Sequence, residues 1–256
     1  MDITVKKKII GLIPTRLNST RLPQKALLEI KNIPLVVHTF KRSKLSKLID
    51  ELYICCDDKK IFNIAKKFGA KCIMTSSHHN NGTERIFEAY KKLSKKKKFD
   101  LIIDIQGDEP LVSPYHIDSV ISHHLKNFNY DIVLPTINSH QKNNTNIIKV
   151  ISNVQKEVLY LSRSNIPFEF KKNTKFINKH LSIISFKPNS LKKFSESKKT
   201  PLEKIEDIEL LRALEIGQKI KTFSLKGDSF SVDVLDDYKK AEKKMSVDKF
   251  FKLYKI

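Results

Sequence analysis

The chain has 256 residues, of which 40% are hydrophobic, and its formal net charge at pH 7 is +21. This length suits one large domain, or one domain with an inserted lobe, and the apolar content is sufficient for a substantial core. The first apolar run, at residues 9–13, ends at Pro14 and is too short for a secretion signal or a membrane span, so we expect a cytoplasmic protein with no membrane partner.

The cysteines and the positive charge narrow the class of protein further. Cys55, Cys56 and Cys72 form no CxxC pattern and are odd in number, which indicates reduced thiols rather than a disulfide framework or a zinc site. The lysine runs at 6–8 and 95–98 resemble solvated surface, and lysine is frequent throughout the chain. This distribution favours compositional bias over a dedicated nucleic-acid face, so we expect no specific nucleic-acid partner. A basic nucleic-acid-binding protein without catalysis is the alternative from another class.

Short apolar runs alternate with helical patterns through the first half of the chain. The expected elements are, in order, a strand at 9–13, a helix at 34–47, a strand at 51–56, a helix at 59–68 closed by Gly69, a strand at 71–74, a helix at 83–93, a strand at 101–105 and a helix from 114 to about 126. This alternation predicts an α/β fold in which helices cover both faces of a parallel sheet.

The pattern changes after residue 131. Strands are expected at 132–135, 147–151, 158–162 and 181–186, with polar connections between them. We interpret about 131–186 as a smaller β-rich lobe or dimerisation insert within a single domain of residues 1–256. Thr200, Pro201 and Glu203 then form a capping box that starts a helix ending at Gly217. A strand at 220–225 and a terminal helix from about 236 complete the chain.

The loop after the first strand is the first candidate for a binding site. Residues 12–25, LIPTRLNSTRLPQK, contain two of only six arginines in the chain, and a guanidinium can grip phosphate oxygens in a fork. In parallel sheets this loop commonly holds phosphate, although no glycine-rich phosphate motif is present here. The positive charges would come from Arg16, Arg21 and Lys25, and the hydroxyl donors from Ser19 and Thr20. A solvated basic loop is the other interpretation.

Two further segments offer polar groups at strand or helix ends. QGDEP, residues 106–110, follows the strongest strand and places Asp108 where it could hold a magnesium ion, although the same letters also suit a turn. Asp233 in SVD is a second possible metal ligand or a helix N-cap. NGTER, residues 81–85, starts a helix and projects Arg85, which could equally be a surface residue beside a helix cap.

Taken in order, these motifs resemble the 3-deoxy-manno-octulosonate (Kdo) cytidylyltransferases, also called CMP-Kdo synthetases. The resemblance extends from residue 9 to about 245 and rests on IPTRLNSTRLPQK, NGTER, DIQGDEP, LSRSNIP, the histidine before LSIISF, TPLEKIEDIELLRALEIG and SVD. It implies a Rossmann-like nucleotidyltransferase fold related to GT-A, with a mixed sheet and a smaller lobe for dimerisation and sugar binding. It also implies a homodimer that uses CTP and Mg²⁺ to activate an acidic sugar for lipopolysaccharide or another surface polysaccharide.

The resemblance also implies roles for individual residues. The nucleotide would be bound by Arg16, Ser19, Thr20, Arg21, Lys25, Asn81, Gly82, Thr83 and Gln106. The sugar acid would be bound by Arg85, Gln106, Arg163, His180 and Glu209. Magnesium would be held by Asp108 and Asp233, and catalysis would depend on Arg16, Arg21, Lys25 and Asp108.

Three positions differ from the family pattern. Ile184 replaces a usual tyrosine, Leu210 replaces a usual glutamine after the helix glutamate, and Ser231 replaces a glycine. The first two lie near the sugar in the family, so an 8-amino-Kdo or a nonulosonate such as sialic acid is an alternative substrate to Kdo.

Overall fold

The computed structural model describes residues 6–19 and 21–255, which form two compact units. Unit 1 comprises the described residues up to Ser119 together with those from Ser229 onward, and unit 2 is Val120–Asp228. The boundary between the units falls within helix α4 (Pro114–Lys126). In the part of the chain that the structure describes, no helix is long and apolar enough to cross a membrane.

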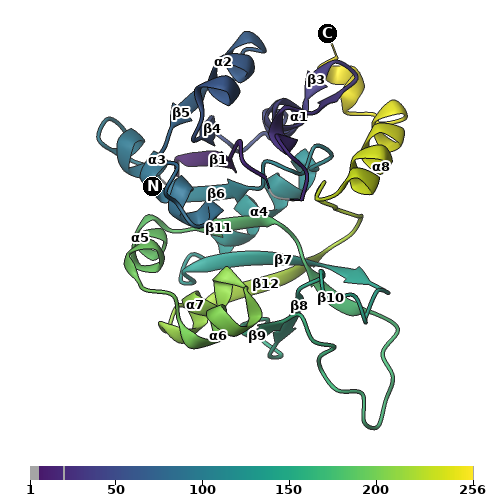
Figure 1. Ribbon diagram of the computed structural model, residues 1–256. Helices are drawn as coiled ribbons and strands as arrows, with labels where there is room; N and C mark the ends of the chain where they lie inside the picture. The colour runs from purple at the N-terminus through teal and green to yellow at the C-terminus, as the bar shows by residue number, and fades with distance from the viewer. Residues whose placement is uncertain (1–5, 20, 256) are drawn as a thin grey trace. The chain divides into compact units, whose positions relative to one another are not determined.

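Unit 1 contains a parallel sheet with strand order β5-β4-β1-β6 (Figure 1). Its strands are β1 (Ile9–Thr15), β4 (Glu51–Cys56), β5 (Cys72–Met74) and β6 (Leu101–Ile105). The first six residues of β1 are all buried, as expected for a central parallel strand, and α1 and α3 both contact it. The predicted strands of the first half are thus confirmed, and Cys55 and Cys56 end β4 as free thiols.

The helices of unit 1 are α1 (Leu35–Ser43), α2 (Lys59–Lys67), α3 (Gly82–Ser94) and α8 (Leu235–Ser246). Gly69, with φ +78°, lies just beyond α2 where the sequence predicts the end of that helix. The chain also forms two short 3₁₀ turns, Lys25–Leu27 and Phe251–Leu253.

The helix predicted at 34–47 is shorter than expected at both ends. A hairpin of β2 (Glu29–Ile30) and β3 (Ile33–Pro34) precedes α1 and takes up its predicted first residue. Lys31 and Asn32 form the hairpin turn with φ angles of 52° and 61°. Positive φ at both central residues matches the twist of a two-residue hairpin, and asparagine tolerates this conformation well.

Unit 2 is a mixed sheet built on β7 (Ile132–Ser139). One edge of β7 pairs in antiparallel fashion with β11 (Ile183–Phe186) and then with β10 (Ile177–His180), while β12 (Ile220–Leu225) runs parallel to β7. β10 continues through β8 (Lys149–Ser152) to β9 (Val158–Ser162). The sequence did not predict β10 or helix α5 (Pro188–Glu196), and the strand predicted at 181–186 begins only at Ile183.

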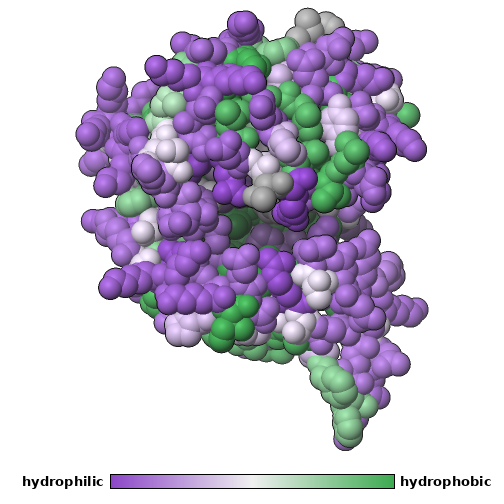
Figure 2. All heavy atoms as spheres, in the orientation of Figure 1, coloured by the Kyte–Doolittle hydropathy of each residue, from purple (hydrophilic) through white to green (hydrophobic). Residues whose placement is uncertain are grey.

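A long connection at residues 163–176 joins β9 to β10. It exposes Phe168 and Phe170, whose relative exposures are 84% and 83%. Figure 2 shows apolar side chains at the tip of this loop. Phe176, the last residue of the same connection, is also exposed, and three exposed phenylalanines in one loop are unusual on a surface that is otherwise rich in lysine.

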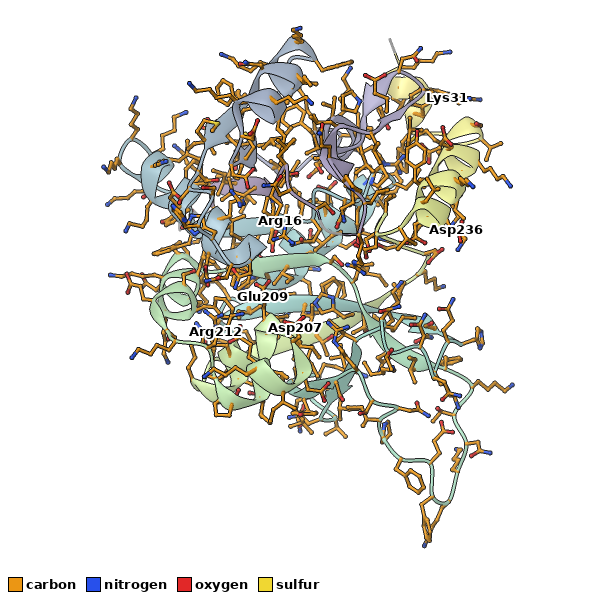
Figure 3. The ribbon with its side chains drawn as sticks, in the orientation of Figure 1. Arg16, Lys31, Asp207, Glu209, Arg212 and Asp236 are labelled. Atoms are coloured by element: carbon orange, nitrogen blue, oxygen red, sulfur yellow. The ribbon has the colours of Figure 1, made fainter. Side chains whose placement is uncertain are left out.

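The helix predicted from Thr200 to Gly217 is two helices, α6 (Pro201–Glu206) and α7 (Glu209–Glu215). Asp207 has φ 50° and ψ 47°, a left-handed conformation that ends α6 and turns the chain before Glu209 (Figure 3). Glu203 accepts a hydrogen bond from Thr200 N at 3.3 Å, as the predicted capping box requires. The prediction of one continuous helix was therefore wrong, although its predicted start and end lie within two residues of the start of α6 and the end of α7.

Candidate active site

The carboxyl ends of β1 and β6 lie close together in unit 1 because two glycines permit it. A Cβ atom on Gly107 would lie 2.7 Å from Pro14 O, which is backbone and cannot move aside. A Cβ on Gly82 would lie 3.2 Å from Pro14 Cγ and 3.7 Å from Gln106 Nε2. The loop after β1, the turn after β6 and the start of α3 therefore meet at one edge of the sheet.

Two cations and two carboxylates converge at this edge. Lys25 Nζ lies 2.7 Å from Asp108 Oδ2 and 3.1 Å from Asp233 Oδ1. Arg21 Nη2 donates to the same Asp233 oxygen at 3.0 Å. The loop with Arg21 and Lys25, the turn with Asp108 and the segment with Asp233 are far apart in the sequence. The fold therefore brings together charged residues that the sequence predicted as separate candidates.

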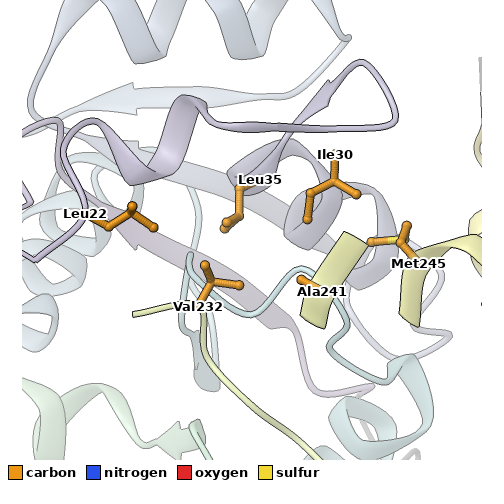
Figure 4. Packing of buried hydrophobic residues seen from close by; sticks show 6 residues of the cluster. All are labelled: Leu22, Ile30, Leu35, Val232, Ala241 and Met245. Carbon is orange, nitrogen blue, oxygen red and sulfur yellow. The ribbon is translucent and has the colours of Figure 1, made fainter. Parts of the chain in front are cut away.

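An apolar cluster holds these four side chains in place. Leu22, next to Arg21, packs in one cluster with Val232, next to Asp233 (Figure 4). The same buried cluster contains Ile30, Leu35, Ala241 and Met245. In addition, Val232 N donates to Asp108 O at 2.9 Å, which ties the segment before α8 to the turn after β6.

The charges of the cluster are mutually stabilised. Burial alone would lower the pKa of Lys25, but Asp108 and Asp233 outweigh it and the net effect is a raised pKa. Burial alone would raise the pKa of Asp233, but Lys25 and Arg21 outweigh it and the net effect is a lowered pKa. Lys25 is therefore an ammonium and Asp233 a carboxylate at neutral pH.

The carboxylates suit a magnesium ion by their chemistry. Both point an oxygen at one cationic atom, Lys25 Nζ, so they already share a place where positive charge is stabilised. Within residues 6–19 and 21–255 no group of three or more acidic, His or Cys side chains could hold a metal. Magnesium is commonly held by one or two carboxylates while substrate phosphates and water complete its coordination, so this pair fits it. Asp233 does not cap α8: Asp237 Oδ2 accepts from Asp233 N and Val234 N instead.

The remaining residues of the opening loop differ in their surroundings. Arg16 is exposed in the loop after β1, and its guanidinium has no partner among the described residues (Figure 3). Ser19 is half-buried. Thr20 lies outside the described residues.

Gln106 and Asn81 are anchored by neighbouring polar groups. Gln106 Nε2 donates to both carboxylate oxygens of buried Asp104 at 3.0 Å, which fixes the amide at the end of β6. Asn81 Oδ1 accepts from Glu84 N at 2.8 Å, so its side chain is the N-cap of α3. Gly82 and Thr83 follow as the first turn of that helix.

Arg85 is not a surface residue, because only 3% of it is exposed. Its guanidinium donates to Thr75 Oγ1 at 2.8 Å and to Asp57 Oδ2 at 3.1 Å. The other oxygen of Asp57 accepts from Leu17 N at 3.1 Å, so Arg85 supports the opening loop through Asp57. A direct contact between Arg85 and a sugar stays a prediction.

Asp57 and Asp104 are positioning residues that the sequence analysis missed. Both are carboxylates beside the carboxyl end of a parallel strand: Asp57 directly follows β4, and Asp104 is the residue before the last of β6. This position was available as a signal, because the ends of neighbouring parallel strands meet at one edge. Asp104 lies in the DIQGDEP motif and Asp57 in none of the quoted motifs, and only the folded chain shows what each one holds.

The predicted sugar-binding residues Arg163, His180 and Glu209 belong to unit 2. Arg163 follows β9, His180 ends β10, and Glu209 begins α7. Burial lowers the pKa of His180 to about 4, so its imidazole is neutral at pH 7. The roles of these three residues stay predictions.

The chain has extensive similarity to known proteins. Residues 10–220 match the family model described as Cytidylyltransferase. The 3-deoxy-manno-octulosonate cytidylyltransferase of Thermodesulfovibrio yellowstonii is 40% identical over 248 residues, which cover 91% of this chain and 96% of that protein. The 8-amino-3,8-dideoxy-manno-octulosonate cytidylyltransferase of Shewanella frigidimarina is 34% identical over 245 residues, which cover 94% of this chain and 100% of that protein.

A solved structure agrees with the sequence matches. It is the structure of CMP:2-keto-3-deoxy-manno-octonic acid synthetase complexed with CTP, which superposes with a TM-score of 0.88 at 28% identity and covers 94% of this chain and 99% of that one. The predicted α/β nucleotidyltransferase fold and the predicted enzyme class are thereby confirmed. Because the family model matches well over half of the chain and a curated relative is 40% identical over 91% of it, the chain belongs to the cytidylyltransferase family, among the 3-deoxy-manno-octulosonate cytidylyltransferases.

Proposed function

We propose that the protein transfers CMP from CTP to the anomeric hydroxyl of Kdo and releases pyrophosphate. The observation that carries this proposal is the convergence of Arg21 and Lys25 on Asp108 and Asp233 in a chain of this family. The product would serve the synthesis of lipopolysaccharide or another surface polysaccharide.

The reaction requires an environment that tolerates a triphosphate and the charge of its leaving group. The sugar hydroxyl attacks the α-phosphorus, a new P–O bond forms, and the bond to pyrophosphate breaks. Arg16, Arg21 and Lys25 would bind the phosphate oxygens, and Lys25 and Arg21 already lie beside the two carboxylates. Catalysis would then rest on positioning and on electrostatic stabilisation of phosphoryl oxygens rather than on a covalent enzyme intermediate.

Asp108 and Asp233 would hold the magnesium ion. When bound, this ion would supply positive charge to the phosphate oxygens and help to orient the triphosphate. The Lys25 ammonium has three N–H donors and gives one to each carboxylate in this structure, so we expect the third to donate to a phosphate oxygen when CTP binds.

An 8-amino sugar is the second candidate for the acceptor. Ile184 and Leu210 are buried apolar residues of unit 2, at positions where the family usually has tyrosine and glutamine. A relative at 34% identity is named for an 8-amino substrate. Loss of two polar side chains on the sugar side would alter discrimination between hydroxyl and amino groups.

We also propose that the enzyme is a cytoplasmic homodimer. The exposed Phe168 and Phe170 support an interface with a second copy, because large apolar side chains gathered on a surface mark interaction sites.

One experiment tests the catalytic proposal directly. Pyrophosphate release from CTP is measured with Mg²⁺ present and with Kdo, 8-amino-Kdo and sialic acid as separate acceptors. We expect release with one of the two eight-carbon acids. Absence of release with every acid, together with DNA or RNA binding that weakens steeply with salt, would instead favour the nucleic-acid-binding alternative.

A further inference from the structure

Lys149 on β8 is a buried cation that the reaction described above does not use. Only 1% of it is exposed, and Nζ donates to the backbone oxygens of Asn144 at 2.8 Å and Arg163 at 2.7 Å. Among the residues that the structure describes, no carboxylate lies within ion-pair distance of this ammonium. Burial of an unpaired charge is costly, so a lysine kept at this position requires an explanation.

Arg163 is a second cation held by carbonyl oxygens. Its Nε donates to Glu206 O at 2.8 Å, Nη1 to Thr145 O at 3.2 Å and Nη2 to Asp207 O at 3.1 Å. Lys149 and Arg163 are also joined directly, because the Lys149 ammonium binds the carbonyl oxygen of Arg163 itself. The two positive charges therefore belong to one cluster.

Glu206 is the carboxylate that acts on this cluster, but its oxygens are engaged elsewhere. Oε1 accepts from Ser162 Oγ at 2.6 Å, and Oε2 accepts from Arg163 N at 3.0 Å. Burial, and then Arg163, lower the pKa of Lys149, while Glu206 acts in the opposite direction. Two cations and one carboxylate leave an excess of positive charge, which an anionic ligand would neutralise.

Strand pairing places Lys149 between the residues expected to bind the sugar. In the register of the sheet Lys149 lies opposite Ser162 of β9 and opposite Lys179 of β10. The next residues along those two strands are Arg163 and His180. The cross-strand neighbours of Lys149 are therefore the residues that immediately precede Arg163 and His180, which the proposed function assigns to the acidic sugar.

We propose that Lys149 is a positioning residue for the sugar acid. It holds the main chain of Arg163, and its charge adds to the attraction that Arg163 exerts on the substrate carboxylate. This inference rests on the proposed function in one respect, the assignment of Arg163 to the sugar.

The test compares Lys149→Met and Lys149→Gln with the unchanged protein. Lys221→Met is the matched control, because Lys221 is in the same unit and its Nζ also donates to a backbone oxygen, Gln155 O at 2.5 Å. The measurements are KM for Kdo at saturating CTP, KM for CTP, kcat and the melting temperature. Kd for Kdo is also measured by calorimetry without CTP.

We expect Lys149→Met to raise KM and Kd for Kdo on the order of tenfold, because an ammonium near a carboxylate in a partly desolvated site is lost. The KM for CTP should stay within about twofold of that of the unchanged protein. Lys149→Gln can still donate one hydrogen bond but carries no charge, so we expect an intermediate increase. Lys221→Met should leave both constants unchanged.

Several outcomes would overturn the inference. If KM and Kd for Kdo are unchanged in both variants while the unchanged protein turns over, Lys149 does not act on the sugar and the proposed function still stands. If neither variant folds, Lys149 is a structural residue only. If the unchanged protein gives no turnover with any acid, the proposed function fails, and the Kd values alone decide the inference: equal values, or no binding of Kdo at all, reject it.

Discussion

The guanidinium of Arg212 in α7 grips the carboxylate of Glu203 in α6 through two hydrogen bonds. The Nε–Oε2 distance is 2.7 Å and the Nη2–Oε1 distance is 2.5 Å. Both residues are buried, and Arg212 is 1% exposed. This ion pair joins two helices that the left-handed Asp207 separates, so it stabilises the turn that precedes Glu209.

Glu203→Gln should therefore destabilise the protein strongly. The change leaves a buried guanidinium without its counter-charge, and we expect a loss of about 3–5 kcal/mol in the free energy of unfolding, measured by urea denaturation. The control is Lys92→Met, which removes an exposed pair with Glu88 and should cost at most about 1 kcal/mol. Equal stability of the two variants would show that the buried pair contributes little.

Asp108→Asn should lower turnover strongly and leave the fold intact. The amide has no negative charge with which to balance a metal ion or the Lys25 ammonium, so we expect kcat to fall on the order of a hundredfold to a thousandfold, comparable to loss of one transition-state contact. Steady-state kinetics and circular dichroism give the two readouts. Asp236→Asn makes the same chemical change at an exposed position of the same unit and should keep full activity. Normal turnover in Asp108→Asn would remove the metal assignment.

Stability should fall as the pH decreases from about 6.5 to about 4. Burial, which is the largest cause, lowers the pKa of His38 and of His124 to about 4 from the usual 6.5. Between these pH values the two histidines are protonated in the unfolded chain but still neutral in the folded chain. The free energy of unfolding therefore decreases by up to about 3 kcal/mol for each histidine. Above pH 6.5 this effect is absent.

Denaturant titrations at several pH values check this dependence. His38 accepts from Tyr254 OH at 2.9 Å and donates Nε2–H to Ile30 O at 2.7 Å, roles assigned from the chemistry of its partners. Replacing His38 or His124 by Gln should flatten the acid side of the stability curve, whereas exposed His78→Gln should not change its slope. Identical slopes in all variants would contradict the prediction.

Replacing Phe168 and Phe170 together by serine should weaken self-association. If a second copy covers these side chains, their removal takes apolar area out of the interface, and light scattering should show a shift from dimer to monomer as the protein is diluted. The melting temperature of the monomer should be unaffected, because neither side chain is buried. A dimer that persists at the same dilution would place the interface elsewhere.

Local signals in the sequence predict the elements that depend on local chemistry. Apolar runs identify β1, β4 and β6, and Gly69 marks the end of α2 because glycine readily adopts positive φ. The position of Asp108 after a core strand was sufficient to propose it as a metal ligand, whereas the family resemblance was needed to pair it with Asp233. The sequence identified Lys25 as a cation of the opening loop, but it did not show that Lys25 Nζ contacts both carboxylates.

What the sequence could not predict depends on contacts between distant residues. Asp207 adopts a left-handed conformation that an aspartate does not require. At that turn Arg163 donates hydrogen bonds to the carbonyl oxygens of Glu206 and Asp207. In the sequence Arg85 looks like a surface arginine, but in the fold it is buried and donates to Asp57 and Thr75. In both cases tertiary hydrogen bonds override the local preference.

The packing of Leu22 against Val232 and Met245 makes the C-terminal segment a structural support of the candidate active site. A recombinant fragment that ends at residue 220, where the family match ends, would lack Asp233. It would also expose Leu22 in the loop after β1. Recombinant forms of this enzyme should therefore keep the chain through α8, because Leu22 beside Arg21 loses its packing partners without it.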